Sequence, residues 1–242
     1  MELQVWCQTD VGLKRNHNED SFLFNKELDL YLVADGMGGH RGGEIASKLA
    51  VETVEQVIGR HSSIHPTDYR SQLVNAYKEA SQKIYSVSQQ PGSDLQGMGT
   101  TLVAALFRGG VMYIGNVGDS RAYLFAQDQI WQMTEDHSLI NEQLRAGLLS
   151  ESELSKVTAK NVITRSVGFE EEVQVDVIER AVAPGDLILI CSDGLSGLVP
   201  DHRIAEICRS AQRQDIVSIC IDEAKKNGGD DNVTVMVIYA EQ

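Results

Sequence analysis

Apolar residues along the chain gather in short runs that predict strands. The runs are rich in Val, Ile, Tyr and Phe and end at Gly, Asp or Asn, as β-strands commonly do. They cover residues 3–9, 21–24, 30–34, 101–107, 111–117, 122–126, 173–181, 187–191 and 233–239. Arg108, Gly109 and Gly110 separate two of these runs, and this spacing predicts a hairpin.

Four longer segments have the apolar spacing of helices. Residues 43–59 and 68–89 place apolar side chains three and four positions apart, so each segment has a single apolar stripe. Residues 201–210 and 215–227 form a second pair of this kind, and the glycines at 228 and 229 are typical of a helix end. The sequence therefore predicts two pairs of helices.

The order of these elements indicates the fold class. Strands come in runs, helices come in pairs, and regular strand–helix–strand alternation is absent, which favours an α+β fold with mostly antiparallel sheets. No linker or internal repeat divides the chain, so we predict a single domain over residues 1–242. Residues 135–168 are polar and weakly helical and interrupt the strands, and we predict that they form an inserted flap.

Composition and charge narrow the range of partners. The chain of 242 residues has 35 acidic and 21 basic residues, a formal charge of −14. Nucleic acids and anionic membranes bind basic faces, so we expect neither as a partner. The four cysteines are scattered and form no Cys-x-x-Cys pair, which is typical of reduced thiols. No run approaches the roughly 18 apolar residues of a membrane span, and no signal peptide is visible, so we expect a cytoplasmic protein.

Five acidic residues stand where an apolar strand meets a turn. Asp35, Asp119 and Asp193 follow strands, whereas Asp20 and Asp231 precede them. A single Asp at a strand end is ordinary turn chemistry. If antiparallel pairing brings these ends to one pole, the carboxylates repel one another unless they are protonated or bridged by cations. Such oxygen ligands suit Mg²⁺ or Mn²⁺, and the dispersed histidines argue against zinc.

The glycine-rich segment at residues 36–43 matches neither of two common phosphate-binding motifs. A P-loop would have Lys and Ser or Thr where Glu44 and Ile45 stand, and a dinucleotide fingerprint would have Gly in place of Arg41. Asp35 would repel a directly bound phosphate. The pattern therefore favours phosphate binding through a metal, with glycines that let the backbone approach closely.

A set of short motifs occurs in order across nearly the whole chain. They read RNHNED at 15–20, DGMGGH at 35–40, GMGTT at 97–101, NVGDSR at 116–121, DHS at 136–138, SDGL at 192–195 and GDDNVTV at 229–235. Together they resemble the PPM/PP2C family of metal-dependent protein serine/threonine phosphatases, of the compact bacterial type. The resemblance implies a four-layer αββα sandwich, in which two sheets are flanked by helix pairs and a metal centre lies at one end.

The resemblance also implies a ligand set for two core ions, Mg²⁺ or Mn²⁺. Asp35 would bridge the two ions, and the backbone carbonyl of Gly36 would bind one of them. Asp193 and Asp231 would complete the site of the first ion. Asp20 would support the second ion through water.

Three further roles follow from the same resemblance. Asp119, together with Asp193, would serve a third ion near the flap. Arg15 matches the arginine that grips the substrate phosphate, a task that suits a guanidinium because it donates two parallel hydrogen bonds. His40 would protonate the leaving alkoxide as general acid.

The implied activity is hydrolysis of phosphoserine and phosphothreonine on proteins by a metal-activated bridging water, with no covalent phosphoenzyme. Ser120 and Ser192 lack a His-base motif, so we interpret them as turn or supporting residues. The expected partners are phosphorylated signalling proteins, the targets of a Ser/Thr kinase, and the expected state is a monomer.

Two alternatives to a protein phosphatase were weighed. One is a binding module on the same fold without catalysis, which the presence of all five carboxylates disfavours. The other is a metal-dependent phosphodiesterase or nuclease, which the absence of a basic groove in the sequence disfavours.

Several features add to or depart from the family pattern. Residues 157–165 lack the His-Pro-x-Arg segment that ends the flap of many bacterial relatives, so flap-based substrate preferences do not transfer. Asp230 is either a solvated turn residue or a residue that tunes the metal site. Trp6 and Trp131 are predicted core residues. Because the other acidic residues are mostly surface, we expect poly-acidic phosphopeptides to be poorer substrates than basic ones.

Overall fold

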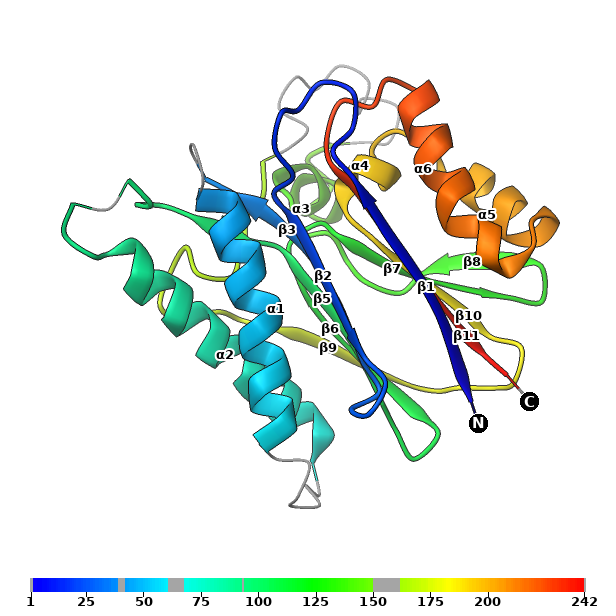
Figure 1. Ribbon diagram of the computed structural model, residues 1–242, viewed down its shortest axis with the longest axis horizontal. Helices are drawn as coiled ribbons and strands as arrows, with labels where there is room; N and C mark the ends of the chain where they lie inside the picture. The colour runs from blue at the N-terminus through cyan, green and yellow to red at the C-terminus, as the bar shows by residue number, and fades with distance from the viewer. Residues whose placement is uncertain (1, 39–41, 61–67, 93, 150–161, 242) are drawn as a thin grey trace.

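The computed structural model describes residues 2–38, 42–60, 68–92, 94–149 and 162–241. In these ranges the chain folds into two antiparallel sheets that face each other, with a pair of helices on each outer face (Figure 1). This αββα order confirms the fold predicted from the sequence. The catalytic candidate His40 and much of the flap (residues 150–161) lie outside the described residues.

The first sheet has the strand order β1-β11-β10-β7-β8. Its strands are β1 (Leu3–Asp10), β11 (Val233–Ala240), β10 (Leu187–Cys191), β7 (Arg121–Ala126) and β8 (Gln129–Gln132). β1 and β11 pair along their whole length, from Leu3 opposite Ala240 to Asp10 opposite Val233. The helices α5 (Asp201–Ser210) and α6 (Ile216–Lys226) pack on its outer face, joined by a 3₁₀ turn at Arg213–Asp215.

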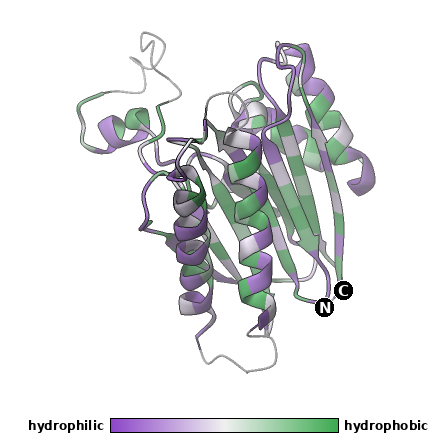
Figure 2. Cartoon of the chain, turned by 60° about the vertical axis from the view of Figure 1, so that its left-hand side comes forward, coloured by the Kyte–Doolittle hydropathy of each residue, from purple (hydrophilic) through white to green (hydrophobic). Residues whose placement is uncertain are grey.

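The second sheet has the strand order β2-β3-β5-β6-β9, and a short strand β4 pairs with the end of β3. Its strands are β2 (Asp20–Asn25), β3 (Leu30–Met37), β4 (Gly99–Thr100), β5 (Leu102–Arg108), β6 (Val111–Val117) and β9 (Asp176–Ala181). The helices α1 (Gly42–Arg60) and α2 (Tyr69–Ser88) cover it, and their apolar stripes face the strands (Figure 2). Gly109 and Gly110 form the predicted β5–β6 hairpin, both with positive φ.

Strand β3 shows why some runs in the sequence are wholly apolar. Successive side chains of a strand point to opposite faces. Leu30, Leu32 and Ala34 therefore pack under the α1–α2 pair, whereas Tyr31 and Val33 enter the core between the two sheets. A central strand of this sandwich is buried on both faces, so it carries no polar alternation.

The structure corrects the sequence predictions at five points. β8 was not predicted, because this four-residue edge strand is largely exposed and polar. Trp131, predicted to be core, lies on β8 and is 41% exposed. β9 begins at Asp176 rather than at residue 173, and a single turn of helix, α4 (Asp193–Ser196), follows β10 directly. Within the described part of the flap, residues 139–145 form the helix α3 (Leu139–Arg145).

Candidate metal centre and active site

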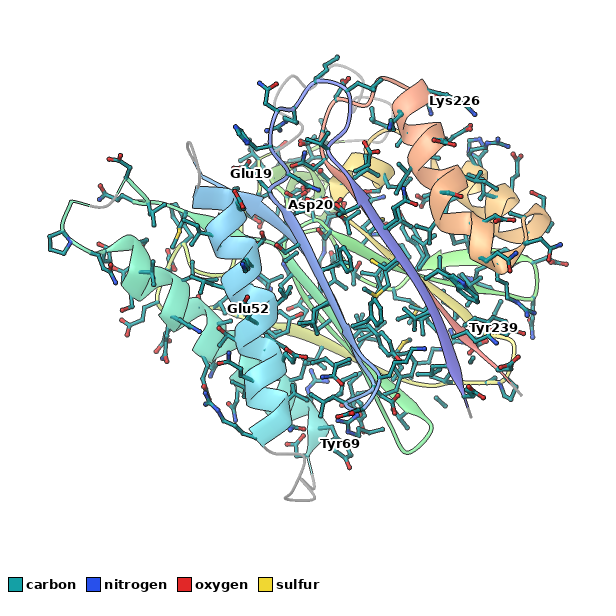
Figure 3. All side chains as sticks on the ribbon, in the orientation of Figure 1. Glu19, Asp20, Glu52, Tyr69, Lys226 and Tyr239 are labelled. Carbon is teal, nitrogen blue, oxygen red and sulfur yellow. The ribbon has the colours of Figure 1, made fainter. Side chains whose placement is uncertain are left out.

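The carboxylates predicted from the strand ends meet at one end of the sandwich. Asp20 and Asp35 are directly opposite each other in the β2–β3 ladder, and Glu19 and Asp20 lie at the upper end of β2 in Figure 3. Asp193 opens α4 after β10, and Asp231 lies in the turn before β11. Three of these carboxylates, those of Asp35, Asp193 and Asp231, line a pocket of about 320 Å³, which we call the carboxylate pocket; its lining also includes Arg15, Glu19 and Gly36.

The backbone around Asp35 is held by the two threonines of the GMGTT motif. The Asp35 amide donates to Thr101 Oγ1 at 2.9 Å, and its carbonyl accepts from the Thr101 amide at 2.9 Å. The Thr100 hydroxyl donates to the same carbonyl at 2.8 Å. Thr101 Oγ1 also shares a 2.7 Å hydrogen bond with the hydroxyl of Ser120, beside Asp119. These contacts fix the Asp35 strand end relative to the Asp119 turn.

Asp20 is buried beneath the pocket and is only partly satisfied. Its Oδ2 accepts hydrogen bonds from Ser192 Oγ at 2.8 Å and from Thr234 Oγ1 at 2.6 Å. Its Oδ1 is buried without a hydrogen-bond partner, and the Oδ1 of Asp119 is in the same position. Ser192 and Ser120 are themselves fully buried and hydrogen-bonded, which fits supporting residues rather than nucleophiles.

Burial and mutual repulsion favour the protonated form of these acids. Burial, followed by the charges of Asp20 and Asp193, raises the pKa of Asp35 well above its usual value. Burial outweighs the two hydroxyl hydrogen bonds on Asp20 and raises its pKa to about 7. Burial and the charge of Asp193 raise the pKa of Asp119 to about 7, and burial and Asp231 raise that of Asp193. The cluster thus contains too little positive charge to stabilise all of its carboxylates in the ionised form.

The donor set fits hard divalent cations. Buried carboxylates with raised pKa values, two of them with an unpartnered oxygen, gain most from a cation that takes oxygen ligands. Among the described side chains, no three acidic, imidazole or thiol groups by themselves form a cluster that could hold a metal ion. Carbonyls and water would therefore complete the coordination, as they do for Mg²⁺ and Mn²⁺. Among the residues that the structure describes, the lining of the pocket contains no histidine or cysteine, which is unlike a zinc site.

Glycine at position 36 brings two backbone segments together at the pocket. A Cβ on Gly36 would lie 2.0 Å from the carbonyl oxygen of Gly43, at the start of α1. The Gly36 amide donates to the carbonyl of Glu19 at 3.1 Å. This packing leaves no room for a side chain, and it places the Gly36 backbone, the predicted carbonyl ligand, on the pocket wall.

Arg15 reaches the pocket from an exposed loop that Asn232 holds in place. Arg15 Nη2 donates to Asp231 Oδ2 at 2.7 Å. The Asn232 side chain accepts from the Glu19 amide at 2.8 Å and donates to the carbonyls of Val11 and His17, each at 2.9 Å. One buried amide side chain thus anchors both ends of the loop that carries Arg15. Asp230, next to Asp231 in the sequence, instead pairs with Lys14 at 2.6 Å on the exposed surface. This contact fits the interpretation of Asp230 as a solvated turn residue.

A polar network connects the flap to the Asp119 turn. His137 Nδ1 accepts a hydrogen bond from the Gly118 amide at 3.0 Å, so its Nε2 carries the proton when the ring is neutral. Nε2 lies 3.1 Å from Asp176 Oδ2, and Asp176 also pairs with Arg165 at 3.0 Å. Burial lowers the pKa of His137. The flap is therefore joined at its base to the turn that carries a predicted ligand.

Comparisons with known proteins show the family of the chain. The family description "Protein phosphatase 2C" matches residues 13–218 of the chain. The chain belongs to the protein phosphatase 2C family. It is 37% identical over 238 residues to the serine/threonine phosphatase Stp of Listeria innocua, an alignment that covers 96% of this chain and 93% of that one.

Solved structures of the family share the whole fold. The serine/threonine phosphatase PstP/Ppp of Mycobacterium tuberculosis has a TM-score of 0.91 and 32% identity, with 99% of each chain covered. The catalytic domain of PstP in complex with two manganese ions has a TM-score of 0.88, 32% identity and the same coverage. The PP2C fold is therefore present over nearly the entire chain.

Two residues in or beside the carboxylate pocket were not predicted from the sequence. Glu19 lines the carboxylate pocket, and burial raises its pKa. Asn232 holds the Arg15 loop. Both lie inside motifs that were recognised, but Glu19 stands beside the more conspicuous Asp20, and an Asn at a strand start is as typical of an ordinary turn.

Within the described ranges, no helix is both long enough and apolar enough to cross a bilayer.

Proposed function

We propose that the carboxylate pocket is the catalytic centre of a metal-dependent phosphatase that hydrolyses phosphoserine and phosphothreonine on proteins. As a member of the PP2C family, the chain is a protein serine/threonine phosphatase that depends on divalent metal. The observation that carries the location of the site is the convergence of the predicted strand-end carboxylates, with raised pKa values and unpartnered buried oxygens.

The residues that would hold the cations are those predicted from the sequence. Asp35 and Gly36 line the pocket together with Asp193 and Asp231, and Asp20, opposite Asp35 in the β2–β3 ladder, would act as a supporting group. The two manganese ions in PstP support two core ions here, and the repulsion between Asp119 and Asp193 supports a further cation near the flap. When bound, such ions supply Lewis-acid activation of water and neutralise phosphoryl oxygens.

Arg15 is placed to bind the substrate phosphate. Its guanidinium lines the pocket and is about half exposed, so a phosphate can reach it from solvent. A guanidinium offers paired donors that match two phosphoryl oxygens. Because Asp231 already orients the Arg15 head, little side-chain entropy remains to be lost when phosphate binds. Arg15 thus orients the phosphoryl group and balances its charge.

The described side chains offer no competing protein nucleophile at the pocket. Ser120 and Ser192 are buried supporting groups, and burial raises the pKa of Cys7 and of Cys191 to about 12, so both remain thiols. Direct attack by water, without a covalent phosphoenzyme, is the mechanism consistent with this. His40, outside the described residues, keeps its proposed role as the proton donor to the leaving serine or threonine oxygen.

A matched pair of aspartate variants tests the location of the site. With a phosphoserine peptide and Mn²⁺, Asp193→Asn should lose nearly all turnover because it removes a pocket carboxylate. Asp222→Asn, on the exposed face of α6, makes the same chemical change and should keep wild-type turnover. Circular dichroism reports whether each variant is folded. Wild-type turnover by a folded Asp193→Asn protein would place the active site elsewhere, and cleavage of a phosphodiester at a comparable rate would contradict a monoesterase.

A further inference from the structure

We propose that a groove beside the carboxylate pocket binds the substrate chain next to the phosphorylated residue and selects a basic side chain there. We call it the flanking groove; its lining includes Met37, Ile163, Arg165, Phe169, Glu170 and Glu172. The inference rests on the proposed function, since it assigns a preference to the same active site. It concerns which phosphoproteins are hydrolysed, not whether they are.

The flanking groove is continuous with the carboxylate pocket. Met37 and Ile163 line both cavities. The groove has a volume of about 410 Å³, which lies in the range of ligand-binding pockets and is ample for a long side chain. A peptide whose phosphoryl group enters the carboxylate pocket therefore has a neighbouring residue at the groove.

The free charge of the flanking groove is negative. Glu170 and Glu172 are exposed, and neither forms an ion pair with any side chain in the described ranges. Among the described lining residues Arg165 is the basic one, and its Nη1 donates to Asp176 at 3.0 Å and to the Gln174 carbonyl at 3.3 Å. A cationic side chain of the substrate would meet two unpaired carboxylates within the screening length of about 8 Å.

The segment that carries the glutamates is fixed to the body of the protein. Val167 exchanges two backbone hydrogen bonds with Thr100, of 2.8 and 3.0 Å. Ser81 on α2 accepts from the Gly168 amide at 2.9 Å and donates to the Glu170 carbonyl at 2.8 Å. Gly168 has a φ of +91°, and a Cβ there would lie 2.1 Å from Ile84 Cγ2. The backbone that carries Glu170 is therefore held in place, which lowers the entropic cost of recognition.

Thr100 also links the groove to the chemistry. The same residue that pairs with Val167 donates its hydroxyl to the Asp35 carbonyl. The distance between the groove and the candidate metal ligands is thus set by one residue of β4. Because the spacing between the two cavities is fixed, the rate of hydrolysis should depend on how many residues separate the basic residue from the phosphoserine.

Apolar side chains of the flanking groove suit the stem of an arginine or lysine. Phe169 is 59% exposed, and Met37 lies at the junction of the two cavities. Arg and Lys bury their methylene stems on apolar surface while the charged head stays polar. A guanidinium over the ring of Phe169 would gain a cation–π contact as well. An acidic flanking side chain gains neither and is repelled.

The test compares peptides that share one phosphoserine and differ at a single flanking position. We expect kcat/KM at low salt to be roughly five- to tenfold higher with Arg than with Glu at the best position, since several exposed charges act together. Glu170→Gln with Glu172→Gln should bring this ratio close to one, and Glu170→Lys with Glu172→Lys should invert it. Each variant's peptide rates are divided by its own rate on p-nitrophenyl phosphate, which removes changes in metal loading.

A second double variant controls for the change in net charge. Glu2→Gln with Glu27→Gln makes the same change at the end of the sandwich away from the carboxylates, where Glu27 sits in the β2–β3 hairpin, and it should keep the wild-type Arg-to-Glu ratio. Equal rates on the two peptides for the wild type, or an unchanged ratio in the Glu170 and Glu172 variants, would overturn the flanking groove. Loss of all hydrolysis by the wild type would instead refute the proposed function.

Discussion

The carboxylate end of the sandwich and the flap are neighbours that are built in opposite ways. At the carboxylate end, Asp20 is buried and held by Ser192 and Thr234 from two other elements. In the flap, α3 has no buried residue, and Leu148 just beyond it is 79% exposed. At the carboxylate end, holding repelling charges together lowers the stability of the fold. The flap, in contrast, contributes little to the core. The unfavourable repulsion between the site carboxylates is thus located where the surrounding strands hold the residues in position.

The largest expected effect is on catalysis at the carboxylate end. Asp35→Asn keeps the shape of the side chain but removes the central charge of the cluster. We expect phosphopeptide turnover in Mn²⁺ to fall roughly 10³-fold or more, the scale of losing a main electrostatic group in an active site. Steady-state kinetics measures the loss. Thermal unfolding of the metal-free protein should show no destabilisation, because the variant relieves repulsion; a large drop in the melting temperature would contradict this account.

Removing the anchor of the Arg15 loop should affect both stability and substrate binding. Asn232→Ala leaves the Glu19 amide and the carbonyls of Val11 and His17 without their partner. We expect a loss of about 2–4 kcal/mol of unfolding free energy, from several unmade buried hydrogen bonds, measured by urea denaturation. KM for a phosphopeptide should rise as Arg15 loses its fixed position. Asn227→Ala, which removes one exposed hydrogen bond at the end of α6, is the control and should cost far less.

The pH dependence of metal stabilisation is a third way to probe the carboxylate end. The pKa values of Asp20 and Asp119 are raised to about 7 in the folded protein, above the unfolded value near 3.9. Their contribution to stability is present below the unfolded value and is lost as pH rises through about 7. Metal binding needs the deprotonated forms. The melting-temperature gap between Mn²⁺-saturated and chelator-treated protein should therefore widen from pH 6 to pH 8; a constant or narrowing gap would argue against these acids as ligands or supports.

The smallest effect is expected in the flap. Leu148→Ser replaces an exposed apolar side chain that no core packing requires. We expect the unfolding free energy to change by no more than about 0.5 kcal/mol, as for ordinary surface substitutions. Differential scanning calorimetry provides the measurement. Leu189→Ser, at a fully buried position of β10, is the matched contrast and should be severely destabilising. Similar losses in both variants would erase the distinction between the two regions.

Much of the architecture could be predicted because each apolar pattern in the sequence is compatible with one kind of secondary structure. The stripes of α1 and α2 give helices, and the apolar run of β3 gives a strand buried on both faces. β8 could not be found, because an edge strand with one covered face needs little hydrophobicity. Trp131 was placed in the core on the strength of its size alone, although a large aromatic on an edge strand can remain partly exposed.

The sequence predicts which strand ends carry the site residues, but it does not show that these ends lie together in space. Asp20, Asp35 and Asp193 stand at ends that the sequence shows, whereas their convergence depends on antiparallel pairing between distant segments. The roles of Glu19 and Asn232 depend on which backbone groups approach them in space. A tripeptide such as Asp-Asp-Asn does not reveal that its last member supports another loop.

The full-length pairing of β1 with β11 has a practical consequence for handling the enzyme. The backbone of Glu241 donates to that of Glu2 at 2.8 Å, and the two ends of the chain lie side by side in Figure 1. Eight paired residues at about 3.3 Å each separate this point from the carboxylate pocket. A surface tether attached at residue 2 or at residue 241 would therefore leave the catalytic face pointing into solution.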